Sequence, residues 1–158
     1  MSRMVQVLVL AQYEDEVMEP LTRSDETRTW HGGFERIPGW FVGGWYLEFC
    51  RESQRRGVLA DLEALPWNRP ECVQVMLRDE GDDCFGLWMF QDGALVEVSI
   101  PRTRRVHVPP PSWGKDSPDP GCLWRTDGPD AGAPPAHSPE HEQDPRLSWQ
   151  RGLVVRCR

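Results

Sequence analysis

The stretch 72–100, "CVQVMLRDEGDDCFGLWMFQDGALVEVSI", has apolar residues that recur with a period of two. Three runs within it, 72–78, 84–90 and 94–100, are typical of β-strands. Asp92-Gly93 separates the last two runs and is a strong hairpin signal, because both central residues of a type I′ turn need a positive φ. We therefore expect a three-strand antiparallel meander.

The first connection of this meander carries four carboxylates around one glycine. They are Asp79, Glu80, Asp82 and Asp83. The spacing does not supply the register of a calcium-binding EF-hand loop, and no metal site is predicted. We interpret the segment as a solvated hairpin loop whose charges keep the sheet edge soluble. The alternative is a surface that steers a cationic partner.

Before the meander, every residue of 4–11 ("MVQVLVLA") except Gln6 is apolar. Both faces of a strand here would be apolar, which predicts an interior strand. The segment 12–40 is acidic and then rich in Gly, Pro and Trp. We expect it to form a long ordered loop with one short helix or an extra strand.

A helix is predicted for 41–57, because Phe41, Trp45 and Phe49 are spaced by four and form one apolar face. Gly57 is a natural C′ residue for that helix. A second short helix is expected over 58–66, where Pro66 ends it. The sequence thus predicts an α+β fold: a mainly antiparallel sheet, made of the N-terminal strand and the three-strand meander, with one or two helices on one face.

Composition divides the chain at about residue 108. We expect a globular domain over 1–108, followed by a mostly irregular Pro/Gly-rich tail over 109–158, which holds ten of the 15 prolines. Within the tail, 146–157 is the stretch expected to form a short element that packs back onto the domain.

The net charge is -7, from 25 acidic and 18 basic residues, which argues against nucleic acid as a partner. No apolar run is long enough to span a membrane. The five cysteines have no zinc-ligand spacing, and we expect them to be reduced in a cytoplasmic protein. Glycine-rich phosphate loops and nucleophile motifs are absent, so no cofactor and no catalytic residue is predicted.

Acidic residues and loop tryptophans are the candidate partner-binding residues. The set comprises Glu14, Asp15, Glu16, Trp30, Trp40, Asp79, Glu80, Asp82 and Asp83. Carboxylates steer the association with a basic partner, and exposed loop tryptophans mark binding surfaces. The alternative for the two tryptophans is that they anchor their loops on the core.

Three functions remain open on these observations. We favour a small acidic protein-binding module, such as a cytoplasmic inhibitor or immunity-type antidote of a basic effector. The first alternative is a small enzyme or ligand-binding domain with a pocket between sheet and helix, lined by Trp30, His31 and Trp40. The second is a non-catalytic structural or regulatory subunit that uses its Pro-rich tail, including "VPPPSW" at 108–113, to bind partners.

Overall fold

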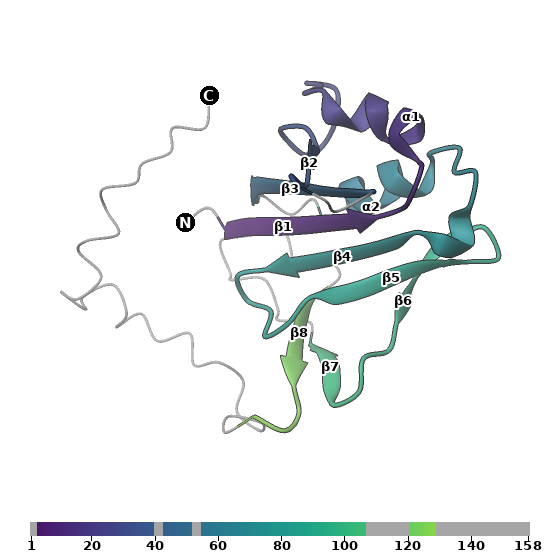
Figure 1. Ribbon diagram of the computed structural model, residues 1–158. Helices are drawn as coiled ribbons and strands as arrows, with labels where there is room; N and C mark the ends of the chain where they lie inside the picture. The colour runs from purple at the N-terminus through teal and green to yellow at the C-terminus, as the bar shows by residue number, and fades with distance from the viewer. Residues whose placement is uncertain (1–2, 40–42, 52–54, 107–120, 129–158) are drawn as a thin grey trace.

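The computed structural model describes residues 3–39, 43–51, 55–106 and 121–128. Its main sheet has the strand order β2-β3-β1-β4-β5-β6, and every neighbouring pair is antiparallel (Figure 1). The strands are β1 (Arg3–Leu10), β2 (Glu35–Arg36), β3 (Gly44–Arg51), β4 (Gln74–Asp79), β5 (Gly86–Gln91) and β6 (Ala94–Val98). A smaller sheet pairs β7 (Thr103–Val106) with β8 (Cys122–Arg125).

Two short helices accompany the sheets: α1 (Asp15–Met18) and α2 (Arg55–Glu63). Two 3-10 turns, Glu19–Thr22 and Pro70–Cys72, complete the described elements. The fold is therefore α+β and dominated by an antiparallel sheet, as predicted.

The meander forms as expected from β4, β5 and β6. At the hairpin between β5 and β6, Asp92 has φ 52° and Gly93 has φ 85°. Both values are positive, as a type I′ turn requires. Gln91 pairs with Ala94 across this turn, which fixes the register of the whole hairpin.

β1 is an interior strand, as predicted, because it pairs with β3 on one side and β4 on the other. Its two faces differ more than the sequence suggests. Val5, Val7 and Val9 are buried, whereas Leu8 is half-buried and Gln6 is exposed. One face of the sheet therefore carries the core, and the opposite face is only partly covered.

The helix predicted over 41–57 is wrong, because this segment contains strand β3. Trp45, Leu47 and Phe49 are buried on one face of the strand, and Tyr46 and Glu48 between them are exposed. A spacing of four fits both a helix and a strand, since four is a multiple of the strand period. Leu47, two positions from each aromatic residue, is the residue that favours a strand.

The helix expected over 58–66 does form, but it begins and ends three residues earlier, at Arg55 and Glu63. Gly57 is consequently inside the first turn of α2 and does not end a preceding helix. Val58 and Leu62 of α2 are fully buried in the same core as Val5, Val7 and Val9 of β1. Figure 1 shows α2 behind the main sheet. Trp67 closes the end of this helix, because its indole Nε1 donates a hydrogen bond to the carbonyl of Leu62 at 2.8 Å.

The expected loop over 12–40 contains both of the elements considered for it, the short helix α1 and the extra strand β2. Of the tail expected over 109–158, the structure describes 121–128, and there strand β8 forms and pairs with β7. Cys122 and Leu123 of β8 are buried. The stretch 146–157 lies outside the described residues.

Candidate functional site

The acidic turn between β4 and β5 is not a solvated loop. Asp79 and Asp82 are 1% and 3% exposed, and the fully buried Arg55 lies between them. The Arg55 Nε is 3.7 Å from Asp79 Oδ2, and its Nη1 is 3.3 Å from Asp82 Oδ2. The expectation of four carboxylates in water is therefore corrected: a buried arginine from α2 neutralises two of them.

Asp82 connects the turn to β8. Its Oδ1 accepts the backbone N–H of Leu123 at 2.6 Å, and its Oδ2 accepts the N–H of Asp79 at 2.8 Å. Burial raises the pKa of the Asp82 carboxyl above its ordinary value, although these hydrogen bonds and Arg55 favour the charged form. Burial also disfavours the charged form of Arg55 and therefore lowers its pKa. The network thus carries a desolvation cost that its hydrogen bonds offset.

A second arginine, Arg105 of β7, completes the network. Its Nη1 is 3.6 Å from Asp82 Oδ1 and donates a hydrogen bond to the carbonyl of Gly121 at 3.1 Å. Its Nε donates to Glu97 Oε1 at 2.8 Å, and the guanidinium lies over the ring of Trp88 at 5.3 Å. These contacts hold the small sheet against the main one.

The other two carboxylates of the turn are exposed, but they differ in their contacts. Asp83 Oδ2 accepts the N–H of Arg125 at 2.7 Å, which adds a further link to β8. Glu80 is exposed and has no hydrogen bond or ion pair with another described residue. Of the four predicted residues in this turn, only Glu80 has a carboxylate without a structural contact among the described residues.

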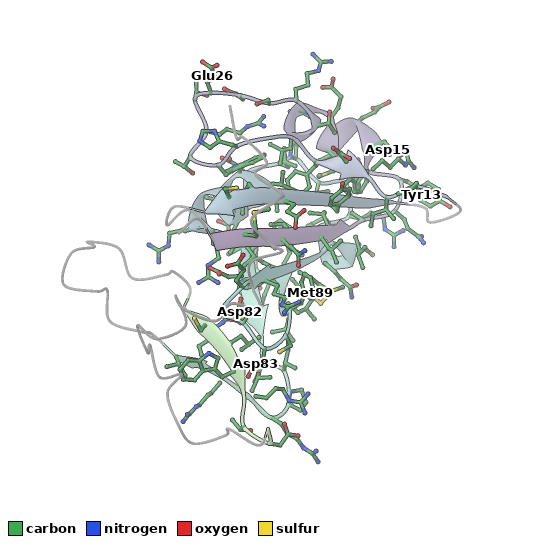
Figure 2. All side chains as sticks on the ribbon, turned by 90° about the vertical axis from the view of Figure 1, so that its left-hand side faces the viewer. Tyr13, Asp15, Glu26, Asp82, Asp83 and Met89 are labelled. Atoms are coloured by element: carbon green, nitrogen blue, oxygen red, sulfur yellow. The ribbon has the colours of Figure 1, made fainter. Side chains whose placement is uncertain are left out.

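The acidic segment at 14–16 lies at the other end of the sheet. β1 ends near Gln74, the first residue of β4, whereas the acidic turn begins at Asp79, the last residue of β4. Figure 2 accordingly shows Asp15 far from Asp82. Asp15 and Glu16 are exposed, and Asp15 forms an ion pair with Arg36. The two acidic segments therefore do not form one surface.

Glu14 is 2% exposed and has a structural contact. Its Oε1 accepts the backbone N–H of Arg69 at 3.0 Å, and its Oε2 accepts the side-chain amide of Asn68 at 2.9 Å. This carboxylate ties the segment before α1 to the segment before β4.

Trp30 is a core residue and is not available to a partner. It is 1% exposed, and its indole Nε1 donates to Asp61 Oδ2 at 2.6 Å. Its ring packs edge-on to Phe34, with centroids 5.8 Å apart. Trp30 thus anchors its loop on the core, which is the alternative that the sequence left open. Trp40 lies outside the described residues.

The face of the main sheet opposite the core carries an apolar surface that the sequence reasoning missed. Leu8 pairs with Tyr46 and Met76, Met76 pairs with Leu87, and Leu87 pairs with Val98. We call this surface the outer face; it comprises Leu8, Leu10, Tyr46, Met76, Leu87, Met89, Val96 and Val98. Tyr46, Val96 and Val98 are 39%, 42% and 38% exposed, and the other five are half-buried. Met89 of β5 marks the outer face in Figure 2.

The signal for this surface was present in the sequence. The outer positions of β5 and β6, Leu87, Met89, Val96 and Val98, are apolar, whereas a strand with one wet face alternates with polar residues. Contiguous exposed apolar residues of this kind mark interaction sites.

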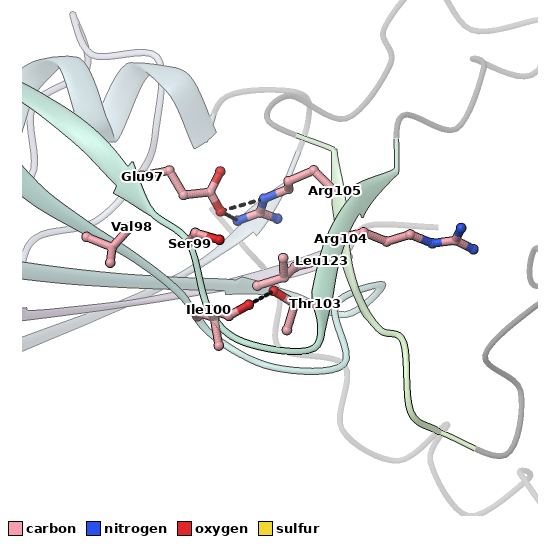
Figure 3. A pocket seen from close by; sticks show the side chains of 8 residues that line it. All are labelled: Glu97, Val98, Ser99, Ile100, Thr103, Arg104, Arg105 and Leu123. Atoms are coloured by element: carbon pink, nitrogen blue, oxygen red, sulfur yellow. Dashed lines mark hydrogen bonds and ion pairs between the residues drawn. The ribbon is translucent and has the colours of Figure 1, made fainter.

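Two shallow cavities border these features. One, of about 210 Å³, lies between β6 and β7, and Figure 3 shows Glu97 and Arg105 paired inside it while Arg104 points away. The hydroxyl of Thr103 donates to the Ile100 carbonyl at 2.8 Å, so Thr103, Glu97 and Arg105 each have a partner within the protein. The second cavity, of about 150 Å³, lies on the outer face beside Tyr46 and Glu48.

Within the described ranges, His, Cys, Asp and Glu side chains form no group of three that could hold a metal ion. No helix in the same ranges is long and apolar enough to cross a membrane. Comparison of the chain with protein-family models, with curated proteins and with solved structures gives no match.

Proposed function

We propose that this protein is a non-catalytic protein-binding module and that the outer face of its main sheet is the docking surface. The observation that carries the proposal is the apolar row Tyr46, Leu8, Met76, Leu87 and Val98, which crosses five neighbouring strands. A contiguous row of exposed and half-buried apolar side chains of this extent marks an interaction surface. Rigid strands also give a binding surface a fixed shape, which lowers the entropic cost of docking.

The proposal keeps the acidic character expected of the module but changes the residues that act. Asp79, Asp82, Glu14 and Trp30 are buried, and we therefore leave them out of the surface. The net charge of -7 still favours a basic partner through long-range attraction. An inhibitor or antidote of a basic effector, acting in the cytoplasm, remains our preferred biological role.

The enzyme alternative receives less support. Of the three residues expected to line a pocket between sheet and helix, Trp30 is in the core, His31 is exposed, and Trp40 lies outside the described residues. The alternative based on the Pro-rich tail rests on residues outside the described ranges.

A photo-crosslinking amino acid placed at single positions tests the surface in the cell of origin. Position 87 lies on the outer face. Position 26, which is Glu26 in Figure 2, is an exposed loop residue and serves as the control. We expect one protein to be crosslinked from position 87 and not from position 26. If position 87 gives no crosslinked protein, or if both positions give the same products, the docking surface is not the outer face.

A further inference from the structure

The apolar row on the outer face ends in an acidic group. Tyr46 lies at the β3 end of the row, between Glu35 of β2 and Glu48 on its own strand. Its hydroxyl donates a hydrogen bond to Glu35 Oε2 at 3.2 Å. Glu48 Oε1 accepts a hydrogen bond from Gln6 Nε2 at 3.0 Å. Two carboxylates thus flank an exposed aromatic ring where the apolar row begins.

The charge of this group also acts on the tyrosine. The hydrogen bond to Glu35 and the negative charge of Glu35 raise the pKa of Tyr46, and the charge of Glu48 adds to the effect. The phenol is neutral at physiological pH even at its ordinary pKa of 10.0, and it presents its ring next to the carboxylates of Glu35 and Glu48.

Arginines neutralise several of the other exposed acids of this protein. Asp15 pairs with Arg36, Glu19 with Arg23, and Asp127 with Arg125. Glu35 and Glu48, like the exposed Glu16 and Glu80, form no ion pair with any residue in the described ranges. The carboxylates beside the apolar row are thus left to attract a cation from outside.

We infer that the outer face binds a basic amphipathic segment of a protein partner. An arginine or lysine of that segment lies on the Tyr46 ring between Glu35 and Glu48, and its apolar side chains cover Leu8, Met76, Leu87 and Val98. Cations bind over tyrosine rings, and the adjacent carboxylates strengthen the attraction. The row spans four strand spacings of about 4.8 Å, so roughly 19 Å of partner covers it. This inference rests on the proposed function, because it names the partner of the same surface.

The negative charge of the protein favours a basic segment on the outer face over two other possible occupants, a second copy of the chain and an anionic membrane. A second copy of the chain would bring another net charge of -7 towards the face. An anionic membrane surface would be repelled by Glu35 and Glu48 for the same reason. Only a basic segment satisfies the apolar row and the acidic end together.

The test measures the affinity of the full chain for synthetic peptides by calorimetry at low and physiological salt. The probe is an amphipathic peptide with leucines on one face and arginines in its first turn. A peptide with glutamate in place of each arginine and a scrambled peptide of the same composition are the controls. We expect binding of the arginine peptide that weakens with salt, and much weaker binding of both control peptides.

Two double variants locate the binding. Glu35→Gln/Glu48→Gln should weaken binding of the arginine peptide by roughly tenfold and reduce its salt dependence. Glu16→Gln/Glu80→Gln removes the same charge from exposed sites elsewhere and should leave the affinity within about twofold. Equal losses in the two variants, or no loss in the first, would overturn the inference, since general charge attraction would then explain the binding.

A third double variant separates this inference from the proposed function. Val96→Thr/Val98→Thr makes the exposed outer face more polar without touching an acid. If it weakens all peptide binding while the arginine and glutamate peptides bind alike, the docking surface stands and the basic partner is wrong. If it has no effect, the docking surface itself is wrong. Sedimentation of the free chain as a dimer that Val96→Thr/Val98→Thr dissociates would assign the face to a second copy.

Discussion

The Arg55 guanidinium lies 3.3 Å from Asp82 Oδ2, and both side chains are fully buried. The contact joins the first turn of α2 to the connection between β4 and β5. Because Asp82 also accepts the N–H of Leu123, the same carboxylate holds β8 in place. The acidic turn, which looks like a surface feature in the sequence, is thus an internal junction of three segments.

Removing Asp82 should therefore destabilise the fold strongly. We expect Asp82→Ala to lower the free energy of unfolding by about 3–5 kcal/mol, because it removes the nearer of the two described carboxylates that pair with Arg55. Glu80→Ala, two residues away in the same turn but exposed, should change it by less than about 0.5 kcal/mol. Urea unfolding of the two variants measures the difference. Equal effects would show that the buried ion pair is not a stabilising junction.

Glu14 should also behave as a structural residue. Glu14→Ala removes the acceptor for two donors of Asn68 and for the N–H of Arg69. We expect a loss of about 2 kcal/mol in the free energy of unfolding, from polar groups left without partners. Glu16→Ala, in the same acidic segment but exposed, is the control and should be near neutral. A neutral Glu14→Ala would contradict the role given to this carboxylate.

The two faces of the sheet should respond differently to the same substitution. Val75→Thr places a hydroxyl in the core, where Val75 is 0% exposed, and should cost about 1–3 kcal/mol. Val98→Thr makes the same change on the outer face, where Val98 is 38% exposed, and should cost less than about 0.5 kcal/mol. Thermal unfolding compares the two variants. A large loss for Val98→Thr would mean that the outer face is covered within the protein itself.

The titration of Tyr46 provides a test of the acidic end. In a Tyr13→Phe background Tyr46 is the one remaining tyrosine, so its ionisation is followed by ultraviolet absorbance. We expect its pKa to lie above the ordinary value of 10.0, because Glu35 accepts the phenol proton in a hydrogen bond. Glu35→Gln should lower the pKa towards that value, and Glu16→Gln should not.

The sign of the Tyr46 shift also sets its effect on stability. A raised pKa means that the folded chain holds the proton more tightly than the unfolded chain does. The hydrogen bond between Tyr46 and Glu35 therefore stabilises the folded chain at pH values below the ordinary pKa of tyrosine. This stabilisation is lost as the pH rises through the raised pKa of Tyr46. A Tyr46 that ionises at or below its ordinary pKa would contradict the contact with Glu35.

The period-two pattern of 72–100 was sufficient to predict the meander, and Asp92-Gly93 to predict its turn, because both are local signals. The same kind of signal failed at 41–57, where a spacing of four fits a helix and a strand equally well. Pairing with β1 decided in favour of β3, since that pairing buries Trp45, Leu47 and Phe49 together. Strand β8 had no local signal, because its four residues depend on β7 and Asp82 for their hydrogen bonds.

Some features of the candidate site could likewise be predicted from the sequence, whereas others depended on tertiary contacts. Composition and patterning determined by themselves that this is an acidic α+β protein, and the apolar residues of the outer face were visible in the strands. Only the tertiary structure decided which carboxylates are buried and which are exposed to solvent. Burial of Arg55 neutralises Asp79 and Asp82, whereas Glu35 and Glu48 stay in solvent beside Tyr46. The physical reason is that the accessibility of a charge depends on which distant segment packs against it, and neighbouring residues do not encode that contact.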